Sequence, residues 1–314
     1  MDGLHDAATD LVVEALRTAH VPVFRMDTAQ FPREVELRGH HNGSGAWSGT
    51  LVTAHRSVEL ADVRAVYWNR PNQVTFPDLS VSDAHWARGA ARIGFGGILT
   101  GLAAGWPRWM NHPSHAAAAE FKPEQLRAAS NAGLDTPRTL ITNCPDAVTQ
   151  FAKDTQGPII TKPMGIPYIA HESIGVETMY TRVVDLSDLN GIETTAHLFQ
   201  EWIEGAFEVR LFSIGGTCHS VRIDAHSEAA SLDWRTYYDA LSYSAVETPQ
   251  EISRAVATYM EAMRLTYAAF DFIVRPDGKW TFLEANPSGQ WAWLNDQCAL
   301  ADAVANTLKG WCTS

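Results

Sequence analysis

The feature that most constrains the fold is a strand-turn-strand pattern near the C-terminus, FDFIV-RPDG-KWTFLEAN, over residues 270–286. Two runs of aromatic and aliphatic residues flank a Pro-Asp-Gly turn, which is a strong signal for a β-hairpin. A turn closed at Asp277 and Gly278 places Asp271 directly opposite Glu284. Asn286 lies two residues further on, so it shares the face of Glu284. The pattern therefore predicts two acids and an amide on one face of an antiparallel pair.

This set of side chains points to a bound cation. Two carboxylates directly opposite each other destabilise a sheet. The same register pairs Ile273 with Phe282, which puts Phe282 and Trp280 on the face of Glu284 and argues against a face turned to water. Carboxylate and amide oxygens are ligands that Mg²⁺ accepts, with water and phosphate oxygens in its other positions. We therefore expect a Mg²⁺ site at Asp271, Glu284 and Asn286; a solvent-facing hairpin is the alternative.

Two lysines are candidates for holding the phosphates of a nucleotide, although the chain has no G-x-x-x-x-G-K-[ST] loop. Lys162 ends the apolar run PIITKP, where a buried cation is costly unless an anion pairs with it. Lys122 starts a helix in EFKPEQL, where a cation is unfavourable unless an anion shares the site. Taken alone, each fits an ordinary surface lysine. Together with the hairpin, they favour a nucleotide site.

A further pair of motifs supplies candidates for the nucleoside and for the transferred phosphoryl group. FQEWIEG at 199–205 is typical of a strand that leads into a glycine turn, where backbone groups pair with an adenine and Glu201 accepts from its amino group. EVRLF places Glu208 and Arg210 on one face of the next strand. We expect Glu208 to hold a ribose and Arg210 to stabilise charge on a phosphoryl group. A surface ion pair remains the alternative.

In chain order, these motifs resemble those of the ATP-grasp ligases, and the last one resembles the ATP-grasp ribosomal peptide maturases (the graspetide or microviridin-type macrocyclases). The superfamily motifs are Lys122, TKP, QEWIEG, EVR, FDF and FLEANPSGQW. Blocks similar to the maturase subfamily are RMDTAQFP, VYWNRP, WMNHP and DWR. The resemblance covers nearly the full chain. The family usually opens with an apolar strand, whereas this chain begins almost at a helix; either the strand is missing or the start codon is assigned late.

The resemblance implies a role for each matching residue. It implies that Lys122 and Lys162 bind the ATP phosphates and that Glu201, Trp202 and Ile203 bind the adenine. It also implies that Asp271, Glu284 and Asn286 hold Mg²⁺. Arg210 is implied beside the γ-phosphate and the acyl-phosphate intermediate, and Arg210 and Asn286 are our catalytic candidates. Arg222 and Arg235 are candidates for binding an acidic peptide, since a guanidinium suits carboxylates; a purely structural role is the alternative that we favour slightly for each. Gln290 and Trp291 are candidates for lining the peptide entrance.

The implied reaction joins side chains within a ribosomal precursor peptide that has a leader and an acidic core containing Ser or Thr. ATP phosphorylates an Asp or Glu side chain, and a Ser or Thr hydroxyl, or a Lys amine, then displaces phosphate to close an ester or amide ring. The resemblance also implies a homodimer. A ligase for small amino acids or a protein terminus is the alternative. A non-catalytic nucleotide-binding regulatory protein is an alternative of another class.

The implied architecture is an α/β ATP-grasp fold with a pre-ATP-grasp α/β domain, a central lobe and a C-terminal antiparallel-sheet lobe that carries the Mg-ATP site. We expect their boundaries at residues 1–115, 116–196 and 197–314. Local patterns predict strands at 21–26, 159–162, 207–214 and 219–224. They predict helices at 4–19, 83–104, 116–133 and 249–264.

Composition excludes several other classes of protein. A formal net charge of −12 argues against binding to a nucleic-acid backbone. No apolar run is long enough to cross a membrane, and the N-terminus has no signal-peptide pattern, so we expect a cytoplasmic protein without a membrane partner. The 4 cysteines form no C-x-x-C pair, which favours reduced thiols over a zinc site.

Overall fold

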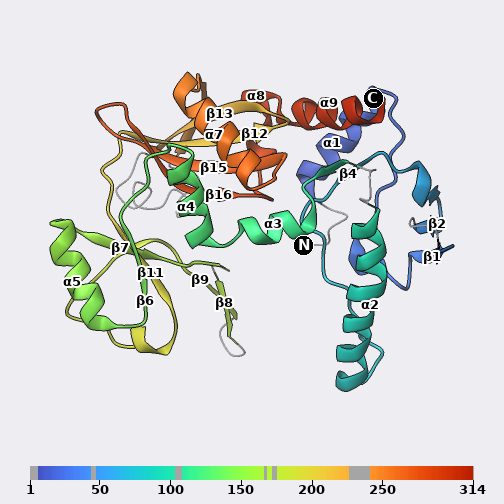
Figure 1. Ribbon diagram of the computed structural model, residues 1–314, viewed down its shortest axis with the longest axis horizontal. Coiled ribbons are helices and arrows are strands. Elements are labelled where there is room, and N and C mark those ends of the chain that lie inside the picture. Colours follow the sequence, from blue (N-terminus) through green and yellow to red (C-terminus); the bar gives the residue numbers. More distant parts are fainter. Residues whose placement is uncertain are drawn as a thin grey trace.

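The computed structural model describes residues 6–43, 47–102, 108–165, 168–171, 175–225 and 241–313. Three parts follow one another along the chain, and the third contains a five-stranded sheet (Figure 1). The helices are α1 (Ala7–Thr18), α2 (Val81–Gly101), α3 (Pro113–Ala119), α4 (Lys122–Asn131), α5 (Pro145–Thr155), α7 (Gln250–Ala262), α8 (Asn295–Cys298) and α9 (Leu300–Thr313). Among the described residues, no helix is both long and apolar enough to cross a membrane.

The first part combines a small antiparallel sheet with a parallel strand pair. The sheet has the order β1 (Glu36–His41), β2 (Trp47–Val52), β3 (Ser57–Glu59), and the parallel pair is β4 (Ala65–Tyr67) with β5 (Arg108–Met110). Residues 21–26, predicted as a strand, form none. Val21 and Val23 pack against the core beneath α9, whereas Phe24 and Met26 pack against a separate core beneath α2. Burial of this apolar run is therefore split between two cores and does not require a sheet.

Helix α2 projects away from the rest of the molecule (Figure 1). It begins at Val81, two residues earlier than predicted, because Ser80 caps it: the Ser80 hydroxyl accepts from the Asp83 amide at 3.2 Å. The predicted single helix at 116–133 is in fact the two helices α3 and α4. Pro123 lacks the N–H that a continuous helix needs, so α4 starts afresh and Lys122 becomes its first residue.

The central part is a four-stranded antiparallel sheet with α5 packed on it. Its order is β10 (Arg182–Val183), β7 (Ile159–Lys162), β11 (His197–Glu201), β6 (Thr139–Thr142), and a separate hairpin pairs β8 (Tyr168–His171) with β9 (Gly175–Thr178). Strand β11 lies between β7 and β6 in this sheet. The expected boundary at residue 197 assigns β11 to the C-terminal part, whereas its hydrogen bonds belong to the central one.

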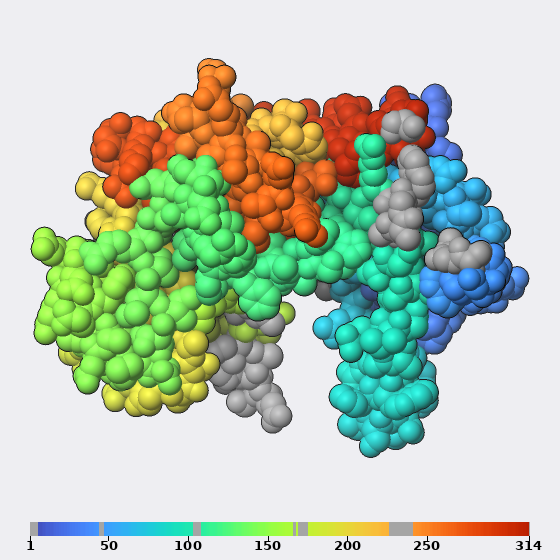
Figure 2. All heavy atoms as spheres, in the orientation of Figure 1, coloured from blue at the N-terminus to red at the C-terminus, as the bar shows by residue number. Residues whose placement is uncertain are grey.

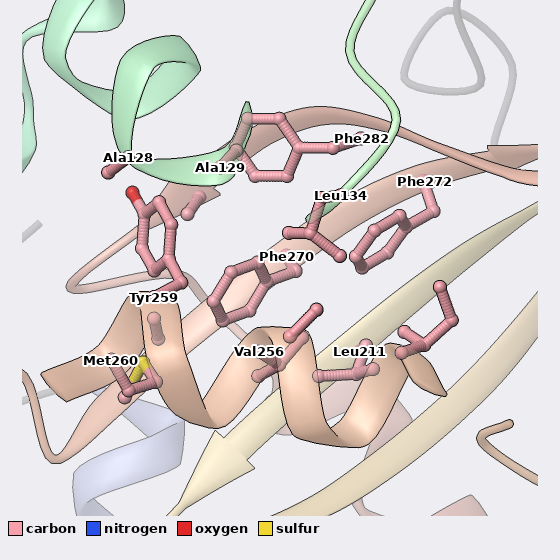
Figure 3. Packing of buried hydrophobic residues seen from close by; sticks show 14 of the residues in the cluster. Ala128, Ala129, Leu134, Leu211, Val256, Tyr259, Met260, Phe270, Phe272 and Phe282 are labelled. Atoms are coloured by element: carbon pink, nitrogen blue, oxygen red, sulfur yellow. The ribbon is translucent and has the colours of Figure 1, made fainter. Parts of the chain in front are cut away.

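The third part is the five-stranded antiparallel sheet. Its order is β14 (Leu241–Val246), β13 (Thr217–Ala225), β12 (Phe207–Ile214), β15 (Tyr267–Val274), β16 (Trp280–Asn286). Helices α4 and α7 cover one face, where aromatic side chains of β15 and β16 surround Tyr259 (Figure 3). Helices α1 and α9 cover one end of the other face. Strands β12 and β15, in the middle of the sheet, are thus largely buried on both faces.

A β-bulge changes the register of the predicted hairpin. Asp271 does pair with Glu284, as predicted, but Phe272 rather than Ile273 pairs with Phe282. Leu283 is the extra residue of β16 at the bulge. Phe282 consequently points into the core of α4 and α7 (Figure 3), while Glu284 lies on the opposite face. The expectation that Phe282 and Trp280 share the face of Glu284 is therefore wrong.

Asp135, just before β6, fastens the outer edge of β16. Its backbone carbonyl accepts from the Phe282 amide at 2.8 Å, and its carboxylate accepts from Thr281 at 2.7 Å and from Lys279 at 2.5 Å. Burial alone raises the pKa of this carboxyl, but the hydrogen bonds from Lys279 and Thr281 and the charges of Lys279 and Arg275 outweigh burial and lower the pKa overall. The connection covers an otherwise open strand edge.

Candidate active site

The candidate site occupies one face of the five-stranded sheet, where three neighbouring strands each contribute a charged residue. Arg210 of β12 lies opposite Asp271 of β15, which in turn lies opposite Glu284 of β16. Residues opposite one another share a face, so the three side chains form a row across the sheet. The strand registers thus assemble a site that no single strand contains.

Arg210 and Asp271 form a buried ion pair at the centre of this row. Arg210 Nη1 donates to both Asp271 oxygens, at 2.8 and 3.0 Å. Only 6% of Arg210 and 8% of Asp271 is exposed. Both charges are therefore largely removed from water, and each depends on the other or on a ligand for compensation.

Lys122 supplies a second ion pair from outside the sheet. Lys122 Nζ donates to Glu284 Oε2 at 2.7 Å, and both side chains are mostly buried. Lys122 is the first residue of α4, so the helix places it at the edge strand β16. Asn286 Nδ2 donates to the other oxygen of Glu284 at 3.3 Å, which directs the amide oxygen of Asn286 away from that carboxylate.

The segment after β16 shapes the surroundings of Arg210. Arg210 Nη2 donates to the backbone carbonyl of Gln290 at 3.3 Å, and the guanidinium carbon lies 5.8 Å from the centre of the Trp293 ring. A Cβ on Gly289 would stand 3.1 Å from Arg210 Nη2 and 2.4 Å from the Ala269 Cβ. Only glycine therefore fits between this loop and the sheet.

The oxygen ligands fit a hard divalent cation that shares its coordination with other molecules. No group of three or more His, Cys, Asp or Glu side chains stands together in the described part of the chain, so these residue types alone do not complete a metal site there. The row offers two carboxylates, and Asn286, two residues beyond Glu284 on the same face, adds an amide oxygen. Mg²⁺ is commonly held by one or two carboxylates, with water and substrate phosphates in its remaining positions. Asp271, Glu284 and Asn286 would hold it, beside the cations Arg210 and Lys122.

Residues predicted to bind the nucleoside lie on or just after β11 and on β12. Glu201 Oε1 accepts from the Arg138 amide at 2.9 Å, so in this structure its carboxylate joins the central sheet. Trp202 is 44% exposed, and its amide donates to the Pro158 carbonyl at 3.0 Å. Ile203 follows it, partly buried. Lys162 ends β7, next to β11.

Glu208 lies two residues before Arg210 on β12, opposite Ile273, and therefore on the face of the charged row. The structure thus brings together one group of predicted residues, Glu208, Arg210, Asp271, Glu284, Asn286 and Lys122, around the five-stranded sheet. Lys162 and Glu201 lie on neighbouring strands of the central sheet but do not meet. Lys162 is opposite Leu198 and Glu201 is opposite Ile159, which places the two side chains on opposite faces. Trp202 and Ile203 follow β11.

Two predicted substrate residues do not join this group, and a third lies outside the described part of the chain. Arg222 lies opposite Val209, on the sheet face that packs against α4 and α7, where it pairs with Asp224 and lies over the Phe207 ring. Trp291 is only 1% exposed and packs in the core beneath α9. Arg235 lies outside the described residues.

Gln290 is exposed, and only its backbone carbonyl contacts a residue of the row. Trp293, 41% exposed beside Arg210, is the tryptophan that the site contains, and sequence reasoning missed it. The alternation in QWAW gives no guide to its position, because the strand ends at Asn286 and the period of two no longer applies.

Comparisons with known proteins show which sequences and folds this chain resembles. The family model of the MvdD pre-ATP grasp domain matches residues 5–82. The macrocyclase MdnC from Microcystis aeruginosa MRC, solved with the precursor peptide MdnA, is 26% identical, with a TM-score of 0.85 over 99% of this chain and 98% of that one. None of the curated proteins matches this chain in sequence.

Two further structures share the fold. A RiPP-associated ATP-grasp ligase from Chryseobacterium gregarium, in complex with ADP and a leader and core peptide, is 24% identical, with a TM-score of 0.89 over 99% of this chain and 95% of that one. The ATP-grasp ligase PsnB, solved with a phosphomimetic variant of a minimal precursor, Mg and ADP, is 21% identical, with a TM-score of 0.76 over 99% and 97%. Full-length agreement in fold, the pre-ATP-grasp domain and the charged row point to one conclusion. The chain is an ATP-dependent ligase of the ATP-grasp superfamily, of the type that matures ribosomal peptides.

Proposed function

We propose that this protein is a peptide macrocyclase that uses Mg-ATP to join side chains within a ribosomal precursor peptide. The observation that carries the proposal is the row of Arg210, Asp271 and Glu284 on one sheet face, in a chain that matches a peptide-bound macrocyclase over nearly its whole length. The row supplies what activation of a carboxylate requires, namely ligands for a divalent cation and an adjacent fixed positive charge.

In the first step, a carboxylate oxygen of a peptide Asp or Glu attacks the γ-phosphorus of ATP, and ADP leaves. Mg²⁺, when bound, neutralises part of the charge on the phosphate oxygens. Arg210 stands beside the proposed metal ligands, where its guanidinium stabilises charge on the transferred phosphoryl group. Lys122 and Lys162 hold the phosphates, while Trp202, Ile203 and Glu208 receive the nucleoside. The product is an acyl phosphate on the peptide.

In the second step, a Ser or Thr hydroxyl, or a Lys amine, of the same peptide attacks the acyl carbon and phosphate leaves. An ester or an amide ring results, and the nucleophile loses its proton. The enzyme promotes this step by holding the two ends of the bound peptide together, which converts an encounter between groups into a reaction within one complex. Arg210 remains beside the phosphate that leaves.

Two alternatives are separated from this proposal by specific observations. A ligase for small amino acids would need no peptide, whereas the matched structures include complexes with precursor peptides. A non-catalytic nucleotide-binding protein would have no use for the full row of Arg210, Asp271 and Glu284, because nucleotide can bind without a group that stabilises phosphoryl transfer.

The test combines the enzyme, Mg-ATP and the product of a neighbouring small gene that encodes repeated Thr with Glu or Asp. Mass spectrometry should show the loss of one water mass per ring. Mild base then distinguishes the bonds, since esters regain water and amides do not. The variant Glu284→Gln should keep the fold and abolish ring closure. Release of ADP with free amino acids, and none with the peptide, would overturn the proposal.

A homodimer is part of the same proposal, supported by the apolar side chains on the projecting end of α2. This end stands clear of the molecule (Figure 2). Along α2, Val81 is 87% exposed, Trp86 74% and Ile93 66%, and the last two lie seven residues apart on one helix face. A second copy of the chain would bury them. Trp86→Glu should convert a dimer to a monomer in light scattering; an unchanged mass would remove α2 from the interface.

A further inference from the structure

Gln125 contacts the backbone of β16 between two proposed metal ligands. Its side chain is 1% exposed. Gln125 Nε2 donates to the Ala285 carbonyl at 2.8 Å, and Gln125 Oε1 accepts from the Ala285 amide at 3.2 Å. Gln125 thus gives Ala285 both of the hydrogen bonds that a neighbouring strand would give. Ala285 lies between Glu284 and Asn286, so this amide sets the position of the backbone that carries both side chains.

Gln125 belongs to the same helix turn as Lys122. The two residues are three positions apart on α4 and face the same way. Lys122 contacts the side chain of Glu284, and Gln125 contacts the backbone of the next residue. A second donated bond, from Gln125 Nε2 to the Ala119 carbonyl at 2.7 Å, anchors the amide to the end of α3. Three hydrogen bonds, to the backbone of Ala119 and Ala285, therefore determine the orientation of the Gln125 amide.

Asn111, from the first part of the chain, performs the corresponding task beyond Asn286. Its side chain is 3% exposed. Asn111 Nδ2 donates to the carbonyls of Pro287 at 2.8 Å and Tyr267 at 2.7 Å. Asn111 Oδ1 accepts from the amides of Thr266 at 2.7 Å and Tyr267 at 3.0 Å. These four bonds tie the start of β15 to the residue that follows Asn286.

We propose that Gln125 and Asn111 are positioning residues for the metal ligands, acting through the backbone on either side of Asn286. This inference rests on the proposed function of Glu284 and Asn286 as ligands. An edge strand has a partner on one side only, and β16 ends at Asn286. Without the two amides, the hydrogen bonds to β15 would be the main restraint on the backbone that carries Glu284 and Asn286. Side chains that hold a metal are normally oriented toward it by further hydrogen-bonding partners, and Gln125 and Asn111 supply such partners here.

If Gln125 and Asn111 position the metal ligands, variants at these residues should lose the gain in ADP affinity that the metal provides. Their ADP affinity without metal should be unchanged. The quantity to measure is the ratio of ADP dissociation constants without and with Mn²⁺, obtained by calorimetry on the full chain in EDTA and in Mn²⁺. Electron paramagnetic resonance of the Mn²⁺-ADP complex reports on the coordination directly. Gln125→Met keeps the shape of the side chain and removes its hydrogen bonds; Asn111→Leu does the same at the second position. Thermal unfolding identifies an assay temperature at which each variant is folded.

Gln200→Met is the matched control. Gln200 is also 1% exposed, and its side chain donates to Thr139 Oγ1 at 2.9 Å within the central sheet. The same chemical change is therefore made away from the proposed metal ligands. Glu201, which follows Gln200, is assigned to the nucleoside, and the ratio cancels any change in nucleotide affinity itself. We expect Gln125→Met and Asn111→Leu to lower the ratio about tenfold, with a changed Mn²⁺ spectrum and unchanged ADP affinity in EDTA. Gln200→Met should leave the ratio unchanged.

Two results would overturn the inference: a normal ratio and Mn²⁺ spectrum in both test variants, or an equal loss in Gln200→Met. Failure of the proposed function gives a different result. If Glu284→Gln retains the full ratio, Glu284 is not a metal ligand and the proposed site falls. If Glu284→Gln loses the ratio while Gln125→Met retains it, the metal site stands and the positioning role of Gln125 falls.

Discussion

Replacing Gly289 with alanine should deform the candidate site through a single added methyl group. The new Cβ would stand 2.4 Å from the Ala269 Cβ, 3.1 Å from Arg210 Nη2 and 3.2 Å from the Asn286 Cβ. Carbon atoms in contact normally lie about 3.5–4.0 Å apart, so the loop must move by about 1 Å from the sheet. Arg210 and Asn286 both border the displaced loop. The substitution therefore acts on the site and on the packing together.

The magnitude follows from these distances. Overpacking a closed core costs about 1–3 kcal/mol of stability. A misplacement of about 1 Å in an active site lowers the rate by roughly 100-fold. Urea unfolding, followed by tryptophan fluorescence, measures the first effect, and ADP release with precursor peptide measures the second. We expect Gly289→Ala to fold with reduced stability and to lose about two orders of magnitude in rate.

A compensating substitution tests the reasoning. Ala269→Gly removes the atom that makes the closest contact, so the double variant should recover part of the lost stability and rate. Gly97→Ala is the control, because a Cβ at Gly97 in α2 would meet no atom within 4 Å. A Gly289→Ala protein with normal stability and rate would refute the prediction. So would a double variant that recovers neither property.

The remaining predictions concern the ion pairs. Lys122→Met should weaken ATP binding, because a phosphate-binding cation is lost, and should strengthen binding of Mn²⁺ alone, because no ammonium competes for Glu284; calorimetry with each ligand checks both signs. Arg210→Met leaves Asp271 buried without its main partner and should lower the free energy of unfolding in urea by about 3–5 kcal/mol. Adding Asp271→Asn to this variant should restore much of that loss. Equal stability of the single and the double variant would contradict this. Asp135 has a lowered pKa in the folded protein, so its stabilising effect is complete above its unfolded pKa of about 3.9 and is lost as the pH falls through the folded pKa. Asp135→Asn should therefore flatten the fall in unfolding midpoint between about pH 5 and 3; an unaltered slope would contradict this.

Local sequence patterns predicted much of the fold and part of the site. The Pro-Asp-Gly turn with its flanking runs predicted β15 and β16 and the pairing of Asp271 with Glu284. The apolar run before Lys162 predicted the bounds of β7, and Pro123 marks the start of α4 at Lys122. Each of these features depends on neighbours in the chain, because turns, strand alternation and helix starts are decided over a few residues.

Features that involve distant partners could not be predicted in this way. The bulge at Leu283 turns Glu284 to the face opposite Phe282. Strict alternation of side chains along a strand cannot predict such an extra residue. Trp291 and Trp293 have similar neighbours in sequence, yet one fills the core beneath α9 and the other lies beside Arg210. Nothing in the immediate neighbourhood of either residue distinguishes them.

By itself, the sequence determined which residue types are available and which of them share a strand or a helix turn. It determined that Arg210 lies on one strand and that Asp271 and Glu284 lie on a hairpin. Only the tertiary structure decided that the strand of Arg210 pairs with the hairpin strand of Asp271. It also decided that Gln125 and Asn111 reach the backbone around Asn286. The physical reason is separation along the chain. Hydrogen bonds to β16 from residues far away in sequence form only after the lobes have packed, and buried amides leave no periodic pattern that would reveal their partners.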